Sequence, residues 1–173
     1  MAKYFAAGLV AVCVWLAAVP AQAQGYLVGS AGGAFGGDAP SGKATYGVAA
    51  GATTGGVLGI EFEFAHTPTF FGESSDSGNV LTLTANLLVG VPVGPIRPYA
   101  VGGAGLIRQR ANVSFGGILN DFTDHDFGYD IGGGLEATLA PHVGLRGDVR
   151  YFHVRKTGGL SFGRAFIGVV LGL

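Results

Sequence analysis

Three histidine-containing segments are the first candidates for chemistry in this sequence of 173 residues. His66 precedes the Ser74–Asp76 stretch, His125 is the middle residue of Asp124–Asp126, and His153 has no acid or serine within three residues. A hydrolase needs a serine, a histidine and an acid that converge, and no histidine here is followed two residues later by a serine. In Asp124–Asp126, a strand would turn the middle residue away from its neighbours, which argues against a metal site. We therefore expect no catalytic residue, no metal site and no cofactor.

Ten charged side chains form a second set, because they occupy alternate positions within apolar segments. In Leu58–Phe64, large apolar residues stand at even positions, whereas Glu61 and Glu63 stand at odd ones. A period of two places the two sets on opposite faces of a strand. The set contains five acids and five arginines: Glu61, Glu63, Arg108, Arg110, Asp130, Glu136, Arg146, Asp148, Arg150 and Arg164.

The polar face that these residues define differs from that of a water-soluble β-sandwich, on which exposed Lys, Thr and Glu would dominate. Here charge is mixed with glycine, and every cation is an arginine, whose planar guanidinium pairs with both oxygens of a carboxylate. Equal numbers of acids and bases suit a closed interior, because an unpaired buried charge is costly. We therefore predict that the polar face lines the lumen of a barrel and that the apolar face meets lipid.

Eight segments share the alternation, and each is long enough to cross a bilayer when tilted. They lie near 26–36, 43–53, 58–64, 81–89, 99–107, 127–139, 143–151 and 164–173. Their connections are short near 54–56, 92–95 and 140–142, and longer near 37–42, 67–78, 109–126 and 155–161. Short periplasmic turns and long outer loops are typical of outer-membrane barrels. The expected fold is therefore all-β, an eight-stranded antiparallel up-and-down transmembrane barrel.

Turns centred on Gly55, Gly94 and Pro141 predict the register of three hairpins. The expected opposite pairs are Phe62 with Val48, Asn86 with Gly102, and Glu136 with Arg146. A slip of one residue would swap the faces of a strand. On the segment 99–107, we expect Tyr99, Val101 and Ile107 on the lipid face and Arg108 in the lumen.

Composition favours strands over helices. Glycine supplies 33 of the 173 residues without a three-residue period, which excludes collagen, and each glycine would cost a helix about 1 kcal/mol. Hydrophobic residues make up 49% and charged residues 12% of the chain, which excludes disorder. Cys13 is the only cysteine, so no disulfide is expected. No basic patch suggests a nucleic-acid partner.

The N-terminal segment has the pattern of a signal peptide. Lys3 is followed by the apolar stretch Tyr4–Val19 and then by Ala21-Gln22-Ala23, the order of a secretory signal with its cleavage site. We expect residues 1–23 to be removed and residues 24–173 to form the barrel. The alternative is a retained membrane helix, which is disfavoured because small residues and strand-like sequence follow directly.

Three segments resemble the small outer-membrane β-barrel family, which includes OmpA-like, OmpX-like and opacity-type porin-like proteins. They are Arg97–Gly105, Phe127–Glu136 and Gly144–Tyr151, and their order and spacing carry the resemblance over the whole chain after the signal. The resemblance implies an integral outer-membrane protein with a role in envelope structure, adhesion or limited permeation. It transfers no catalytic residue.

The outer loops carry the functional hypotheses. Arg155 and Lys156 are candidate contacts for lipopolysaccharide phosphates. The 109–126 loop carries four large apolar residues that either pack over the barrel mouth or form a recognition surface: Phe115, Ile118, Leu119 and Phe122. We expect a structural or surface-interaction role, in adhesion or envelope integrity. The alternatives are a narrow diffusion channel and a lipid-modifying enzyme.

The expected partners follow from this location. They are outer-membrane lipid with its lipopolysaccharide, a surface partner that the outer loops contact, and the barrel-assembly machinery during biogenesis.

Overall fold

The computed structural model describes residues 23–37, 39, 42–68, 79–115, 118–155 and 160–173. For residues 23, 109–115 and 118–125 it describes the backbone alone. The expected signal peptide lies outside the described residues except for Ala23, so its removal stays a prediction. Among the described residues, no helix has the length and apolar character needed to cross a membrane.

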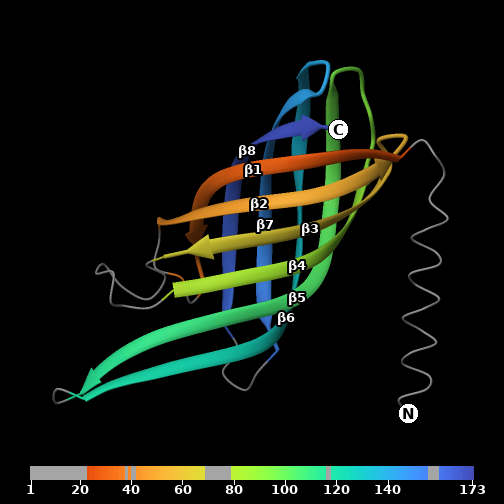
Figure 1. The fold of residues 1–173 in the computed structure, drawn as a ribbon. Coiled ribbons are helices and arrows are strands. Elements are labelled where there is room, and N and C mark those ends of the chain that lie inside the picture. Colours follow the sequence, from red (N-terminus) through yellow and green to blue (C-terminus); the bar gives the residue numbers. More distant parts are fainter. Residues whose placement is uncertain (1–22, 38, 40–41, 69–78, 116–117, 156–159) are drawn as a thin grey trace, which may run out of the picture.

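Eight antiparallel strands form a closed barrel in which each strand pairs with its sequence neighbours and β1 pairs with β8 (Figure 1). The strands are β1 (Ala23–Phe35), β2 (Lys43–Thr54), β3 (Leu58–Thr67), β4 (Asn79–Gly90), β5 (Ile96–Phe115), β6 (Ile118–Ala140), β7 (Val143–Val154) and β8 (Ser161–Gly172). The predicted all-β, eight-stranded up-and-down barrel is confirmed. Closure leaves no sheet edge, which a strand in lipid requires because no water is present to bond its free N–H and C=O groups.

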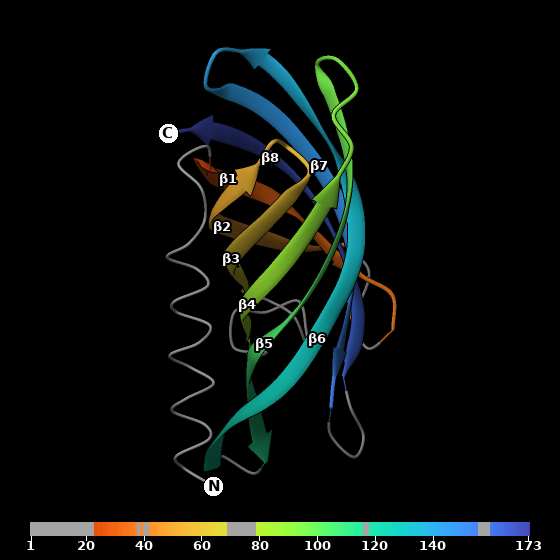
Figure 2. The same cartoon turned by 90° about the vertical axis from the view of Figure 1, so that its right-hand side faces the viewer.

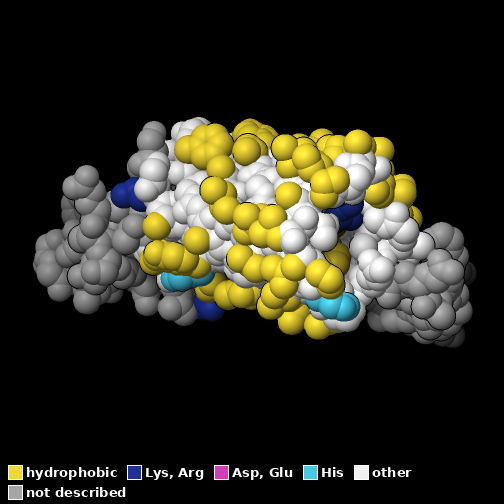
Figure 3. Space-filling model, turned by 90° about the horizontal axis from the view of Figure 1, so that it is seen from above, with side chains coloured by type: hydrophobic (Ala, Val, Ile, Leu, Met, Phe, Trp, Pro, Cys, Tyr) yellow, Lys and Arg dark blue, Asp and Glu magenta, His cyan; other side chains and the backbone are white. Residues whose placement is uncertain are grey.

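The two faces of the wall separate by chemistry, as the alternation predicted. In β3, Phe62 and Phe64 are 58% and 46% exposed on the outside, whereas Glu61 and Glu63 are buried in the lumen. In the view of Figure 3, hydrophobic side chains are spread along the outer wall, while Lys, Arg and His lie toward its two ends. The apolar band is the surface that meets lipid.

The face prediction for β5 is wrong, because the centre of the β4–β5 turn lies between Gly94 and Pro95 and not at Gly94. Val93 and Ile96 exchange two backbone hydrogen bonds of 2.8 and 3.2 Å, which makes Gly94-Pro95 a two-residue turn. Gly94 has a φ of 60°, the positive value that the first position of a type II′ turn requires. Asn86 therefore lies opposite Gly103 and not Gly102.

This shift of one residue exchanges the faces of the whole strand. Tyr99, Val101 and Ile107 are 6%, 2% and 1% exposed, so they point into the lumen and not toward lipid. The other two hairpins keep their predicted faces. Glu136 lies opposite Arg146 as expected, and Val48 lies opposite Phe64, two residues from the expected partner.

Strands β5 and β6 are the longest, with 20 and 23 residues. The predicted 109–126 loop is mostly strand, because the pairing of β5 with β6 continues to Phe115 and Ile118. Pairing of β5 with β4 ends at Arg110, and pairing of β6 with β7 begins at Gly128. The two strands therefore run past the rest of the barrel as a hairpin (Figures 1 and 2).

Apolar side chains fill the lumen at the end where this hairpin projects. The rings of Phe152 and Phe162 stack with centroids 5.1 Å apart, and Val80, Ile107 and Val154 belong to the same buried cluster. At the opposite end of the lumen, Leu88, Tyr99 and Val101 form a smaller one.

A glycine of the lumen face gives a direct test of the β4–β5 packing. A Cβ atom at Gly105 would overlap the backbone carbonyl of Leu83, whereas a Cβ atom at Gly29 would meet nothing within 4 Å. We predict that Gly105→Ala lowers the free energy of unfolding by about 1–3 kcal/mol, the usual cost of overpacking, and that Gly29→Ala has little effect. Urea unfolding of the refolded barrel measures both. Equal effects would contradict the β4–β5 register.

Candidate functional site: the charged barrel interior

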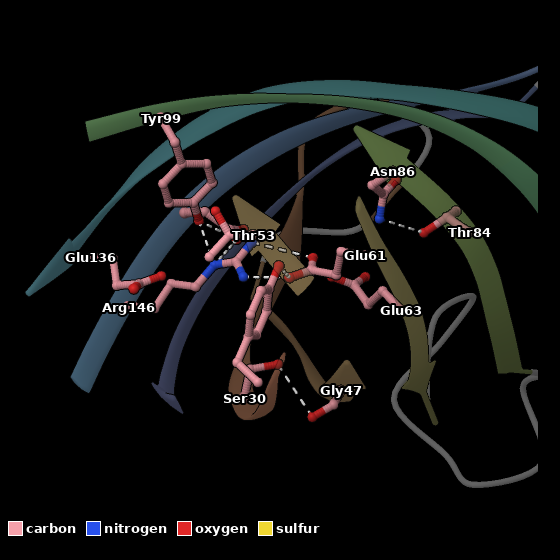
Figure 4. A network of polar contacts seen from close by, with 12 residues as sticks. Ser30, Gly47, Thr53, Glu61, Glu63, Thr84, Asn86, Tyr99, Glu136 and Arg146 are labelled. Atoms are coloured by element: carbon pink, nitrogen blue, oxygen red, sulfur yellow. Dashed lines mark hydrogen bonds and ion pairs between the residues drawn. The ribbon is translucent and has the colours of Figure 1, made fainter. Parts of the chain in front are cut away.

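Arg146 of β7 lies at the centre of the interior network (Figure 4). Its Nη1 and Nη2 atoms donate to the two oxygens of Glu61 on β3, at 2.5 and 3.2 Å, and its Nε donates to the Tyr99 hydroxyl at 2.6 Å. Both charged side chains are buried, with 4% and 0% exposed. A bidentate pair of this kind is strong and fixes the orientation of both groups.

Two tyrosines complete the surroundings of Arg146. The Tyr26 hydroxyl donates to Glu61 at 3.1 Å, and the Tyr99 hydroxyl donates to Asp148 at 2.9 Å. The Arg146 guanidinium also lies 4.7 Å from the centre of the Tyr99 ring, which adds a cation–π attraction. The tyrosines thus link β1 and β5 to the charges of β3 and β7.

Arg150, two residues further along β7, joins the carboxylates to one another. Its Nη2 donates to Glu61 and to Asp148, at 3.1 Å each, and its Nη1 lies 3.2 Å from Glu63 and 3.8 Å from Asp130. The amide of Asn86 satisfies its surroundings when its oxygen faces Arg150 and its nitrogen faces Asp130, at 3.1 Å each. One arginine thus holds four acids together, which offsets the repulsion between them.

Arg164 of β8 closes the network toward the apolar cluster. It donates to Glu63 and, at 3.0 Å, to the hydroxyl of Thr82. Its guanidinium lies 4.3 Å from the ring centre of Phe152 and 4.4 Å from that of Phe166. Arginine suits this position better than lysine because its weakly hydrated plane stacks on aromatic rings.

A separate ion pair lies at the opposite mouth, where the short turns are. Arg97 donates to Glu136 at 2.8 Å and to the carbonyl of Gly56 at 3.3 Å. Although Glu136 lies opposite Arg146 in register, its partner is Arg97, and Arg146 turns to Glu61. The mouth around this pair is a cavity of about 390 Å³, lined among others by Tyr26 and His142.

The structure places eight of the ten predicted lumen residues on the interior face: Glu61, Glu63, Asp130, Glu136, Arg146, Asp148, Arg150 and Arg164. The lumen prediction for Arg108 is wrong. It pairs with Leu81 on the outer face, because the one-residue shift of β5 turns it away from the lumen. The side chain of Arg110 lies outside the described residues. The sequence analysis did not place Tyr26, Arg97 and Tyr99 in the lumen, and a turn at Gly94-Pro95 would have placed the last two there.

The structure describes the side chain of only one of the residues assigned a role in the outer loops. Arg155 is exposed, whereas Lys156 lies outside the described residues. Phe115, Ile118, Leu119 and Phe122 belong to β5 and β6, but only their backbone is described. The roles assigned to these residues stay predictions.

One contact bears on the hydrolase hypothesis. His153 Nδ1 lies 2.8 Å from Ser161 Oγ, a pair that joins β7 to β8 and that no sequence spacing suggested. Both side chains lie on the outer face, and the ring of Tyr129 is 5.2 Å from that of His153. A hydrolase would also need an acid and an oxyanion hole, so the pair by itself is a polar contact of the wall. In the described part of the chain, no three potential metal ligands cluster.

The network leaves little free volume among its own side chains. The space between Glu61, Arg146, Arg150 and Phe166 amounts to about 10 Å³, which is at the lower limit for a single water molecule. The interior of an eight-stranded barrel is just wide enough for its side chains to fill it, and the network fills this part of it.

The family follows from a comparison with known sequences. The sequence model of the family described as "Outer membrane protein beta-barrel domain" matches residues 5–172. The chain belongs to this family. It is an integral β-barrel protein of the bacterial outer membrane, as the resemblance implied. No curated protein matches the chain by sequence.

Solved structures share the fold of this outer-membrane barrel. Neisserial surface protein A has a TM-score of 0.66 at 16% identity, over 87% of this chain and 97% of that one. The barrel domain of Pseudomonas aeruginosa OprF has a TM-score of 0.62 at 15% identity, over 87% and 97%. Ail of Yersinia pestis has a TM-score of 0.61 at 17% identity, over 88% and 99%. At these identities the likeness is one of fold.

Removal of Glu61 tests the network. Glu61→Ala leaves Arg146 without its bidentate partner in a dry interior, so we predict a loss of about 3–5 kcal/mol in the free energy of unfolding. Glu136→Ala is the matched control, because the side chain of Glu136 is 18% exposed at the mouth. When Glu136 is removed, water can solvate the Arg97 guanidinium that it paired with. We expect a clearly smaller loss in urea unfolding. Equal losses would contradict the claim that the buried Glu61–Arg146 pair contributes more to stability than the partly exposed Glu136–Arg97 pair.

Proposed function

We propose that this outer-membrane barrel is a surface-interaction protein whose recognition element is the projecting β5–β6 hairpin. The observation that carries the proposal is the length of these strands. Ala111–Phe115 of β5 pair only with β6, and five residues extend a strand by about 17 Å. Backbone that continues so far beyond its pairing with β4 and β7 adds nothing to barrel closure, which supports a role outside the wall.

The filled lumen favours this function over a diffusion channel. A channel needs a continuous water-filled path, whereas Arg146, Arg150 and Arg164 extend across the lumen to carboxylates of β3. Moving these side chains aside would leave several buried charges unpaired, at a cost of several kcal/mol for each. The similar solved barrels include a surface protein and an attachment invasion locus protein, the class of role proposed here.

Shortening the hairpin tests the proposal. Replacing residues 112–121 by Asn-Gly would let Ala111 and Phe122 close a tight turn, and it leaves intact the pairing of β5 with β4 and of β6 with β7. We predict that cells displaying this variant bind epithelial monolayers and immobilised matrix proteins no better than cells without the protein, whereas the full chain raises binding.

Two controls make the binding result interpretable. A heat-modifiable gel shift reports that the shortened barrel is folded. A variant of unchanged length, with residues 112–121 replaced by alternating Ser and Thr, separates the side chains of the hairpin from its reach. Undiminished binding by the shortened variant would overturn the proposal and leave a purely structural role in the envelope.

Electrical recording addresses the channel alternative. We predict that the refolded protein gives no single-channel steps in planar bilayers, because the interior ion pairs block the path. A general porin in the same bilayer serves as the positive control. Reproducible steps from the wild-type protein would favour the diffusion channel.

A further inference from the structure

A cavity opens at the mouth of the barrel that carries the short turns. Its volume is about 390 Å³, which lies within the range of small-molecule sites. Residues of β1, β2, β5, β6, β7 and β8 contribute to its lining. Because the short turns of outer-membrane barrels face the periplasm, a molecule that enters this cavity comes from the periplasm.

The ion pair of Arg97 and Glu136 forms the charged part of the lining, and it keeps free hydrogen-bonding capacity. The two side chains are 11% and 18% exposed, so a molecule in the cavity can reach them. Arg97 Nη2 donates to Glu136 Oε2 alone, which leaves one of its two N–H groups unused. No described residue donates to Glu136 Oε1. A donor and an acceptor therefore lie side by side in the wall.

His142 lines the same cavity in a backbone conformation that favours glycine. Ala140 pairs with Val143, so Pro141 and His142 are the two turn residues, and the φ of His142 is 66°. Among the described residues, no other residue with a side chain has a positive φ, a conformation that is costly for any residue with a Cβ atom. The ring stands beside β8, where a Cβ atom at Gly172 would lie 3.6 Å from His142 Nδ1. A histidine retained in a strained turn beside a cavity points to a use for its ring.

The charges of the lining specify the class of ligand. Arg97 and Glu136 carry the only full side-chain charges among the described lining residues, and these two charges cancel. A simple anion or cation is therefore not favoured, whereas a zwitterion makes a charge-assisted hydrogen bond to each partner. An uncharged polar molecule would make weaker bonds. The apolar part of the lining, which includes Pro141, Val143 and Val170, suits an aliphatic group.

We propose that this cavity binds a free α-amino acid with an aliphatic side chain. Glu136 Oε1 accepts from the ammonium group, while Arg97 Nη2 and the ring of His142 donate to the carboxylate. The two charges of an α-amino acid are neighbours, as they are in the Arg97–Glu136 pair, so both contacts form at once. The site lies at the mouth opposite the projecting hairpin, and the inference does not depend on the hairpin function.

Three probes that differ by one charged group test the class of ligand. The refolded full chain in lipid nanodiscs is titrated with L-leucine, with 4-methylpentanoate, which lacks only the ammonium group, and with 3-methylbutylamine, which lacks only the carboxylate. Isothermal titration calorimetry measures each Kd. We expect leucine to bind wild type about tenfold more tightly than either analogue, because each analogue loses a charge-assisted hydrogen bond. Equal affinities for the three probes would overturn the proposal.

Two conservative variants locate the site. Glu136→Gln should remove the preference for leucine over 4-methylpentanoate, and Arg97→Gln should remove the preference over 3-methylbutylamine. Lys43→Gln is the matched control, because it removes one positive charge at the start of β2, at the opposite mouth, and we expect it to keep both preferences. A heat-modifiable gel shift reports that each variant is folded. Preferences that persist in Glu136→Gln and Arg97→Gln would place binding elsewhere and overturn the proposal.

His142→Gly separates binding from stability. Glycine adopts a positive φ without strain, so we expect a urea midpoint that does not fall. The same variant should bind leucine about fivefold more weakly, as the loss of one hydrogen bond implies. A lower midpoint with unchanged leucine affinity would show that His142 serves the turn, and it would overturn the part assigned to His142 in the site.

Discussion

The pairing of charges inside the barrel is the constraint on which the rest of this structure depends. Arg146, Arg150 and Arg164 can be almost fully buried only because carboxylates of β3, β6 and β7 surround them. The contacts with Glu61 and Glu63 of β3 cross the lumen, so they link strands that are not neighbours in the sheet. Each of these charged groups would be costly to bury alone. Together they fix the cross-section of the barrel and leave almost no free volume among their side chains.

Because the charge network blocks the lumen, the surfaces available for function lie on the outside of the barrel and at its mouths. The wall presents a continuous apolar surface that ends in a row containing His66 and Arg108, and the β5–β6 hairpin extends beyond it. The long strands and the charge network of the lumen are separate observations. Each of them is explained if the barrel is a rigid support that holds surfaces at defined distances from the membrane.

The sequence predicted the strands well, because a period of two is a direct consequence of strand geometry and one face here is strongly apolar. It predicted most interior charges for the same reason. It failed at β5, where small residues weaken the alternation and a shift of one residue at Gly94-Pro95 decides which face Tyr99 and Arg108 occupy. The sequence also could not predict which charges pair, because Glu61 and Arg146 meet across the lumen and not along the sheet.

A double-mutant cycle between Glu61 and Arg146 tests the central claim most directly. It compares the free energies of urea unfolding of wild type, Glu61→Ala, Arg146→Ala and the double variant in the same detergent. The account predicts a coupling of about 2–3 kcal/mol, near the upper end for residues in contact, because the second substitution removes a charge that the first left unpaired. Additivity within about 0.5 kcal/mol would contradict it and show that the interior pair does not hold the barrel together.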